Sequence, residues 1–126
     1  MPKYLFRVDV APQYMPEQSA PAQGIHTFAY TITITNAGDI PAQLISRHWV
    51  ITHGDGRVEE VKGLGVVGHQ PLLKPGEAFQ YTSGCRLQTP TGSMHGSYFF
   101  VAEDTGRFEV EIPSFMLGGG AERVLH

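Results

Sequence analysis

Apolar and polar residues alternate along several short stretches of this chain, which is the pattern of β-strands with one buried face. The clearest case is residues 28–34, where aromatic and isoleucine side chains alternate with threonines. Residues 4–10 and 108–112 show the same period of two. Because proline cannot donate a hydrogen bond to a neighbouring strand, we expect Pro12 to end the first of these strands and Pro113 the last.

A central strand is predicted around Trp49, which shares one face with Ile45 and Ile51 and should therefore be buried. The turn residues 54–56 then reverse the chain into a returning strand over residues 58–62.

The stretch from Gly63 to Phe100 predicts a glycine loop, a strand, a second glycine-rich loop and a further strand. In the last of these strands, Tyr98 and Phe100 share one face and Phe99 lies on the other.

No apolar period of 3.6 residues persists long enough for a helix. About seven short strands separated by turn residues predict an all-β, antiparallel β-sandwich of immunoglobulin or fibronectin type III type. We expect a single domain over residues 1–117, followed by a glycine-rich tail over residues 118–126 without predicted order.

Composition narrows the function without identifying it. The net charge of −3 argues against a nucleic-acid binder, which needs a basic face to neutralise phosphates. No segment resembles a signal peptide or a membrane span. A single cysteine, Cys85, cannot form an internal disulfide. These features favour a cytoplasmic protein that binds neither nucleic acid nor membrane.

The glycines Gly63, Gly65 and Gly68 match the spacing of a dinucleotide-binding fingerprint. That fingerprint requires a following helix to face the pyrophosphate, and Pro71 and Pro75 exclude one here. Two interpretations stay open. The loop and His69 could form an anion site from backbone N–H groups, with Lys62, Lys74 or Arg86 as nearby cations. Alternatively, the glycines serve only tight turns and close packing.

Neither a metal site nor a catalytic site emerges from the histidines. His48 and His53 should point to opposite faces of one strand, and His69 and His95 could meet only if two loops converge. Ser93 lies near His95, but no third group orients the histidine as a base. We therefore expect no cofactor, no metal and no enzymatic activity.

The spacing of residues in the central stretch resembles the ApaG family. The resemblance rests on Gly63, Gly65, Gly68 and Pro71, then Pro75, Gly76, Phe79, Tyr81 and Gly84, then Thr89, Pro90, Gly92, Met94, Gly96 and Tyr98. It extends to residues 28–30, to Gln43 and Leu44, and to Arg47 and Trp49. One departure is Leu64, which stands where the family often has an acidic residue.

The resemblance implies a fibronectin type III-like sandwich from a small bacterial cytoplasmic protein without established enzymatic activity. It also implies a link to cobalt and magnesium tolerance and, through related eukaryotic domains, to protein binding. Our first hypothesis is a binding module that recognises a protein through loops at one end of the sandwich. The alternative is a sensor of a phosphate-bearing metabolite at Gly63–Gly68. A homodimer is compatible with either.

Overall fold

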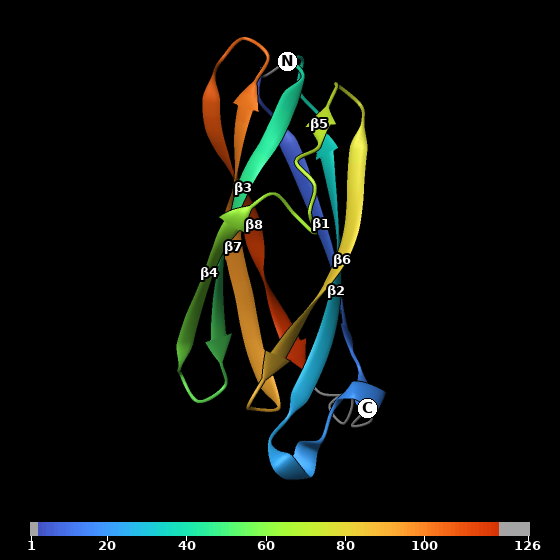
Figure 1. Ribbon diagram of the computed structural model, residues 1–126, viewed down its shortest axis with the longest axis vertical. Coiled ribbons are helices and arrows are strands. Elements are labelled where there is room, and N and C mark those ends of the chain that lie inside the picture. The colour runs from blue at the N-terminus through green and yellow to red at the C-terminus, as the bar shows by residue number, and fades with distance from the viewer. Residues whose placement is uncertain (1–2, 119–126) are drawn as a thin grey trace.

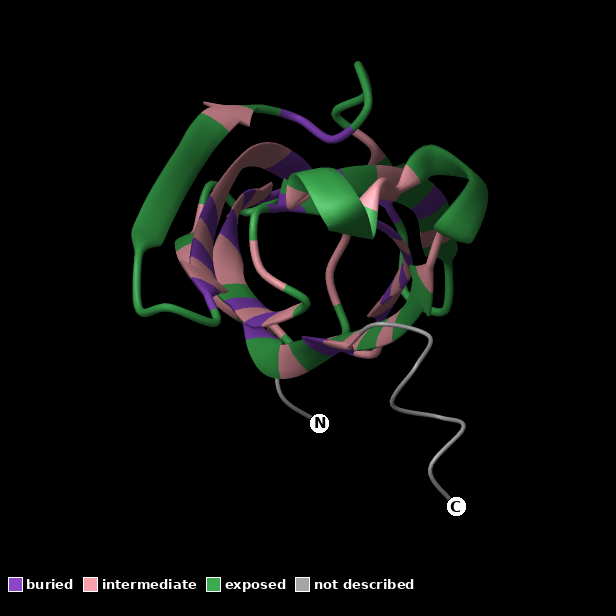
Figure 2. Cartoon of the chain, turned by 90° about the horizontal axis from the view of Figure 1, so that it is seen from below, coloured by how far each residue is buried: buried purple, intermediate pink, exposed green. Residues whose placement is uncertain are grey.

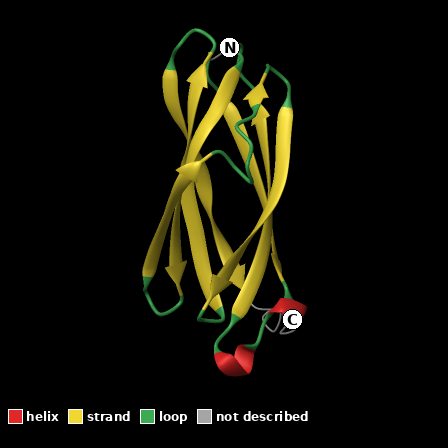
Figure 3. Cartoon of the chain, in the orientation of Figure 1, coloured by secondary structure: helices red, strands yellow, loops and turns green. Residues whose placement is uncertain are grey.

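The chain folds into two antiparallel sheets packed face to face, as the computed structural model of residues 3–118 shows (Figures 1 and 3). One sheet has three strands in the order β1-β2-β6, and the other has the order β4-β3-β7-β8 with β5 paired to β3. The elements are β1 (Phe6–Tyr14), the 3₁₀ turns η1 (Pro16–Gln18) and η2 (Pro21–Gln23), β2 (His26–Asn36), β3 (Ala42–His53), β4 (Val58–Leu64), β5 (Leu72–Leu73), β6 (Ala78–Leu87), β7 (Thr91–Ala102) and β8 (Arg107–Gly118).

This architecture confirms the predicted all-β antiparallel sandwich. Gly118 ends β8, and the rest of the predicted tail, residues 119–126, lies outside the described residues. Within residues 3–118, no helix is long and apolar enough to cross a membrane.

The core lies between the two sheets, where alternate residues of most strands point inward (Figure 2). Trp49 is 3% exposed and packs edge-on against Tyr30 and Phe115, which confirms its predicted burial. Tyr98 and Phe100 are fully buried, whereas Phe99 is half-buried, so the alternation predicted for this strand is also confirmed.

The prediction that Pro12 ends the first strand is wrong, because β1 continues to Tyr14. Met15 donates to the Thr27 carbonyl, and Ala37 donates to that of Leu5. Hydrogen-bonded pairs alternate along an antiparallel ladder, so the odd-numbered residues of β1 face β2 and the even-numbered ones face away. Pro12 thus sits on the outer edge, where no N–H is required.

The prediction that Pro113 closes the last strand is also wrong. Strand β8 continues to Gly118, and its pairing with β7 shifts between Met94 and Gly96. Two residues of β8, Pro113 and Ser114, stand opposite the single residue His95, which defines a β-bulge. An edge strand tolerates proline at such an interruption.

A second irregularity corrects the predicted face of Ile45. The pairing of β3 with β7 shifts between Leu44 and Ser46, so Ile45 is an extra residue, and Leu44 takes the fully buried position. Beyond this bulge, Arg47 pairs with the buried Tyr98 and therefore lies on the inner face. Alternation counted back from Trp49 also places residue 47 on the inner face, but the charge of an arginine argues against that position.

The second glycine-rich loop predicted from the sequence is instead strand. Residues 88–90 form a short connection between β6 and β7, and both Gly92 and Gly96 lie in β7. A methyl group at Gly96 would collide with the main-chain carbonyl of His48, and one at Gly92 would crowd that of Thr52. These glycines allow close approach of β7 to β3.

The two sides of the sandwich differ. On one side, β1 and β8 lie against each other, with the Tyr4 and Phe108 rings stacked at 4.6 Å between centroids. On the other side lie the outer edges of β4 and β6, and the segment that follows β4 crosses between them (Figure 1).

Candidate functional site

The glycine loop, residues 63–69, leaves the end of β4 and closes in a tight turn. Val66 donates to the His69 carbonyl at 2.8 Å, and His69 donates back to the Val66 carbonyl at 2.9 Å. The turn residues Val67 and Gly68 have φ angles of 42° and 83°. Val66 is 0% exposed and is part of the core, so its side chain anchors the turn to the core.

Each glycine of the motif meets a different requirement. Gly65 has a φ of +64°, and a methyl group there would collide with the carbonyl oxygen of His69. At position 68 glycine is required only by the left-handed backbone, because no atom lies close enough to clash with an added methyl group. Gly63 lies under the guanidinium of Arg47, which a methyl group would meet at 2.8 Å.

The glycine loop is tied to the bulged part of β3. The Ile45 carbonyl accepts from the Gly65 amide at 2.8 Å and from the Gln70 side chain at 2.9 Å. The Gln43 side chain donates to the Gln70 carbonyl at 3.0 Å. Arg47 donates to the carbonyls of residues 64 and 65 at 3.0 and 2.9 Å. The extra residue in β3 thus serves as the anchor of the loop.

This geometry leaves few free backbone N–H donors in the loop for an anion. The amides of Gly65, Val66 and His69 already donate to carbonyls. Val67 and Gly68 are both left-handed, whereas an anion nest of the αR–αL kind alternates between right and left. The guanidinium of Arg47 lies against Gly63, and it donates to the loop's own carbonyls.

Of the cations proposed from the sequence, only Lys62 reaches the loop. It pairs with His48 on the outer face of the β4 sheet and lines a hollow with Gly63 and Leu64, which Glu109 also lines. Lys74 belongs to the turn before β6, where its amide donates to Glu77. Arg86 lines a different hollow, with Gln23, Gly24, Ile25, Leu87 and Gln88. The His69 ring packs against Phe79 at 5.7 Å between centroids.

The glycine loop and the strand that follows it present apolar side chains to solvent. Val67, in the turn, is 51% exposed, and Leu72, at the start of β5, is 56% exposed. Val67 is β-branched and adopts a positive φ, which costs on the order of 1–3 kcal/mol and persists only where surrounding contacts enforce it. The structure thus holds an exposed valine in a strained, well-anchored position.

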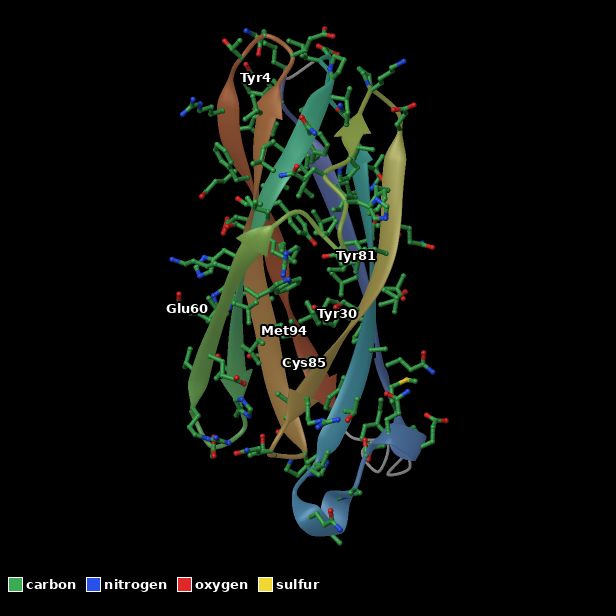
Figure 4. All side chains as sticks on the ribbon, in the orientation of Figure 1. Tyr4, Tyr30, Glu60, Tyr81, Cys85 and Met94 are labelled. Carbon is green, nitrogen blue, oxygen red and sulfur yellow. The ribbon has the colours of Figure 1, made fainter. Side chains whose placement is uncertain are left out.

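Inside the sandwich next to the glycine loop lies a cluster of tyrosines that sequence reasoning did not predict. Figure 4 shows Tyr30 and Tyr81 pointing into the space between the sheets. The hydroxyls of Tyr81 and Tyr98 are hydrogen-bonded at 2.6 Å. Burial raises the pKa of Tyr81 to about 12, and it raises the pKa of Tyr98 further. Both phenols stay protonated at neutral pH, and one hydroxyl donates to the other.

Cys85 is 9% exposed, and burial raises the pKa of its thiol to about 11, with a smaller contribution from Glu59. A nucleophilic cysteine requires the opposite shift. Cys85 is therefore a packed thiol and not an activated one.

The histidines have separate roles. His53 is 4% exposed, bonds the Glu59 carboxylate at 2.6 Å through Nε2 and accepts from the Gln88 amide at 3.4 Å. His48 lies on the opposite face, as predicted, with Glu60 at 3.0 Å. Residues 3–118 contain no group of three or more His, Cys, Asp or Glu side chains arranged to hold a metal.

Asn36 is a further residue whose importance the sequence did not reveal. It is fully buried, and its side-chain amide donates to the carbonyls of Ile40 and Leu73 at 3.0 and 2.9 Å. Its carbonyl oxygen accepts from the Gly38 amide at 2.9 Å. The sequence signalled only a turn here, because asparagine and glycine are both favoured in turns.

Comparison with known proteins identifies close relatives over the full length. The family model described as the ApaG domain matches residues 16–102. The chain is 68% identical over 119 residues to Protein ApaG of Acidovorax sp. (strain JS42), covering 93% of this chain and 87% of that protein. It is 57% identical over 126 residues to Protein ApaG of Ralstonia nicotianae, which covers 100% of both.

Solved structures give the same result. The crystal structure of the Putative ApaA Protein from Bordetella pertussis matches with a TM-score of 0.92 and 57% identity, covering 94% of this chain and 97% of that one. The C-terminal domain of wzt matches with a TM-score of 0.55 at 12% identity, which indicates a shared fold only.

Proposed function

The chain belongs to the ApaG family, and we propose that it is a non-enzymatic module that binds a partner protein through its glycine loop. The observation that carries this proposal is the exposure of Val67, in the anchored turn, and of Leu72, in β5 shortly after it. Rigid apolar side chains bind a protein surface at low entropic cost, because little conformational freedom is lost on binding. The proposed contact surface thus differs from the loops at one end of the sandwich expected from the sequence, since the glycine loop crosses the middle of one side (Figure 1).

The state of the candidate reactive groups supports a non-enzymatic role. Nucleophilic catalysis requires an activated side chain, and burial holds the thiol of Cys85 protonated at neutral pH. The phenols of Tyr81 and Tyr98 are held protonated in the same way.

The proposal is tested by replacing the exposed apolar side chain without disturbing the turn. We expect Val67→Asn to keep the fold, because asparagine accepts the left-handed backbone better than valine does. It should lose the partners that the wild-type protein captures from bacterial lysate. The matched control is Met116→Gln, which removes a 68% exposed apolar side chain from β8, far from the loop in the chain. Equal capture by all three proteins would refute the proposal.

The competing function is a sensor that binds a phosphate-bearing metabolite at Gly63–Gly68. It is favoured only by the glycine spacing and by the two turn amides, Val67 and Gly68, at the exposed tip. Amide chemical-shift titration with pyrophosphate at low salt separates the two functions. We expect no cluster of shifts on residues 63–69 at millimolar pyrophosphate. Such a cluster, abolished by added salt, would favour the sensor.

We further propose that any link between this protein and cobalt or magnesium tolerance is indirect, through the bound partner. The histidines of residues 3–118 are engaged separately, with His53 and His48 each bonded to a single glutamate. A cytoplasmic location, where a lone buried cysteine such as Cys85 stays reduced, agrees with this role.

A further inference from the structure

Strand β4 is an edge strand that stands at the rim of its sheet and is exposed along almost its whole length (Figures 1 and 2). Its apolar residues Val58, Val61 and Leu64 are 59%, 40% and 74% exposed. Strand β8, the opposite edge of the same sheet, carries Pro113 and a bulge. Strand β1, an edge of the other sheet, carries Pro12. Residues 58–64 contain neither proline nor bulge, which are common protections against edge-to-edge pairing.

The backbone of β4 shows which residues are available to pair. At one end of the β3–β4 ladder His53 donates to Arg57, and at the other Gly65 donates to Ile45. Since hydrogen-bonded pairs alternate, the odd-numbered residues of β4 bond β3. The N–H and C=O groups of the even-numbered residues, 58, 60, 62 and 64, therefore point away from the sheet.

We propose that β4 pairs antiparallel with β4 of a second copy of this chain, about a two-fold axis at Val61. In this register Glu60 stands opposite Lys62 of the other copy, and Val58 stands opposite Leu64. Every one of these residues directs its backbone groups outward, so each Glu60–Lys62 pair exchanges two main-chain hydrogen bonds. The two Val61 side chains meet at the axis, and opposite charges and apolar side chains are matched on one face.

Neighbouring registers do not offer this match. A shift of one residue sets Val61 against a glutamate or a lysine and puts outward-facing backbone groups opposite groups that already bond β3. A shift of two residues sets Glu60 against Glu60 in one direction and Lys62 against Lys62 in the other. Like charges directly opposite each other are destabilising. The charges of β4 thus select self-pairing in a single register, and a two-fold interface follows from that symmetry.

Side-chain positions on the free edge agree with this arrangement. Figure 4 shows Glu60 pointing outward from β4. Its carboxylate already lies 3.0 Å from the His48 imidazole, and both side chains are on the outer face of the sheet. A second copy would join the two β4 sheets into one continuous sheet and bury Val58 and Leu64. Val67, in the turn beyond β4, would remain outside the pairing.

A charge-exchange experiment tests the register. Glu60→Lys gives an all-lysine pair and Lys62→Glu an all-glutamate pair, so either variant alone should weaken self-association roughly tenfold or more. An equimolar mixture of the two should associate again, because each lysine then faces a glutamate. The double variant, Glu60→Lys with Lys62→Glu, should also associate. Sedimentation velocity over a range of concentrations at low salt measures all four samples beside the wild type.

A cysteine scan gives a second, independent readout. Val61→Cys should form an interchain disulfide under mild oxidation, because side chains at a non-hydrogen-bonded pair lie close together. Val58→Cys is the matched control, since its equivalent lies far along the other strand, and it should cross-link much more slowly.

Three results would overturn the proposal: a wild-type protein that stays monomeric up to millimolar concentration, a mixture of the charge variants that does not associate, or equal cross-linking of the two cysteine variants. A monomer whose β4 edge instead binds an extended peptide from another protein would also refute self-pairing. Intact tryptophan fluorescence in each variant excludes loss of the fold as the cause.

Discussion

Two glycines of the same loop should respond differently to the same substitution. Gly65 and Gly68 both have left-handed backbones, with φ angles of 64° and 83°. That conformation costs alanine about 1 kcal/mol. Gly68→Ala should therefore lower the free energy of unfolding by roughly this amount and no more. Gly65→Ala has the same backbone strain, and its methyl group also collides with the His69 carbonyl.

Relief of that collision requires the turn to open. The paired hydrogen bonds between Val66 and His69, and the bond from Gly65 to Ile45, would then be weakened. Each such bond contributes about 1 kcal/mol, so the total loss for Gly65→Ala should be about 3 kcal/mol. The fully buried Val66 would lose its fixed position as well.

Urea unfolding followed by the fluorescence of Trp49 measures both variants. With a denaturant slope of ~1–3 kcal/mol per molar for a small domain, Gly65→Ala should lower the midpoint by roughly 1–3 M and Gly68→Ala by about a third as much. Gly56→Ala is a useful control, because Gly56 has a φ of 93° and open surroundings in a different turn. Equal losses at Gly65 and Gly68 would show that the loop yields to the added methyl group and is not rigid.

Three further predictions concern the core. Trp49→Ala should cost ~3–5 kcal/mol by thermal unfolding, because the ring packs on Tyr30 and Phe115, and an unchanged midpoint would contradict its burial. Stability should decline as the pH rises from about 9 to about 11, since the unfolded thiol of Cys85 ionises before the folded one. Cys85→Ser should remove this part of the decline, and an identical pH profile would count against it. Asn36→Asp should cost about 3 kcal/mol at neutral pH, because a carboxylate would face the Ile40 and Leu73 carbonyls, and a loss near zero in urea would refute the role of that amide.

The sequence predicted the fold because period-two alternation reports burial directly, as at Trp49 and Tyr98. It failed at Pro12 and Pro113 because the cost of a proline depends on where the strand lies in the sheet, and alternation carries no information about edges. An edge strand does not need the missing N–H on its outer side.

The candidate site was predicted in part. Glycine spacing located the loop, but the choice between an anion site and a structural turn depends on where each amide points. Arg47 was missed because a charged side chain is rarely expected on a buried face, although it lies two residues before Trp49 and shares its face. Asn36 was missed because burial of a turn residue is a property of the packed fold.

The neighbouring strands β1 and β8 run in the same direction on the closed side of the sandwich. Tyr4 and Phe6 lie beside Phe108 at the start of both strands, so the far end of β8, Gly118, lies a strand length of about 40 Å away (Figure 1). A pulling force applied at Phe6 and Gly118 would run along the strands. Each hydrogen-bonded ladder would then be sheared as a whole, with its bonds sharing the load, and would not open one bond at a time. A load applied between Phe6 and Gly118 would therefore be resisted by whole ladders of hydrogen bonds.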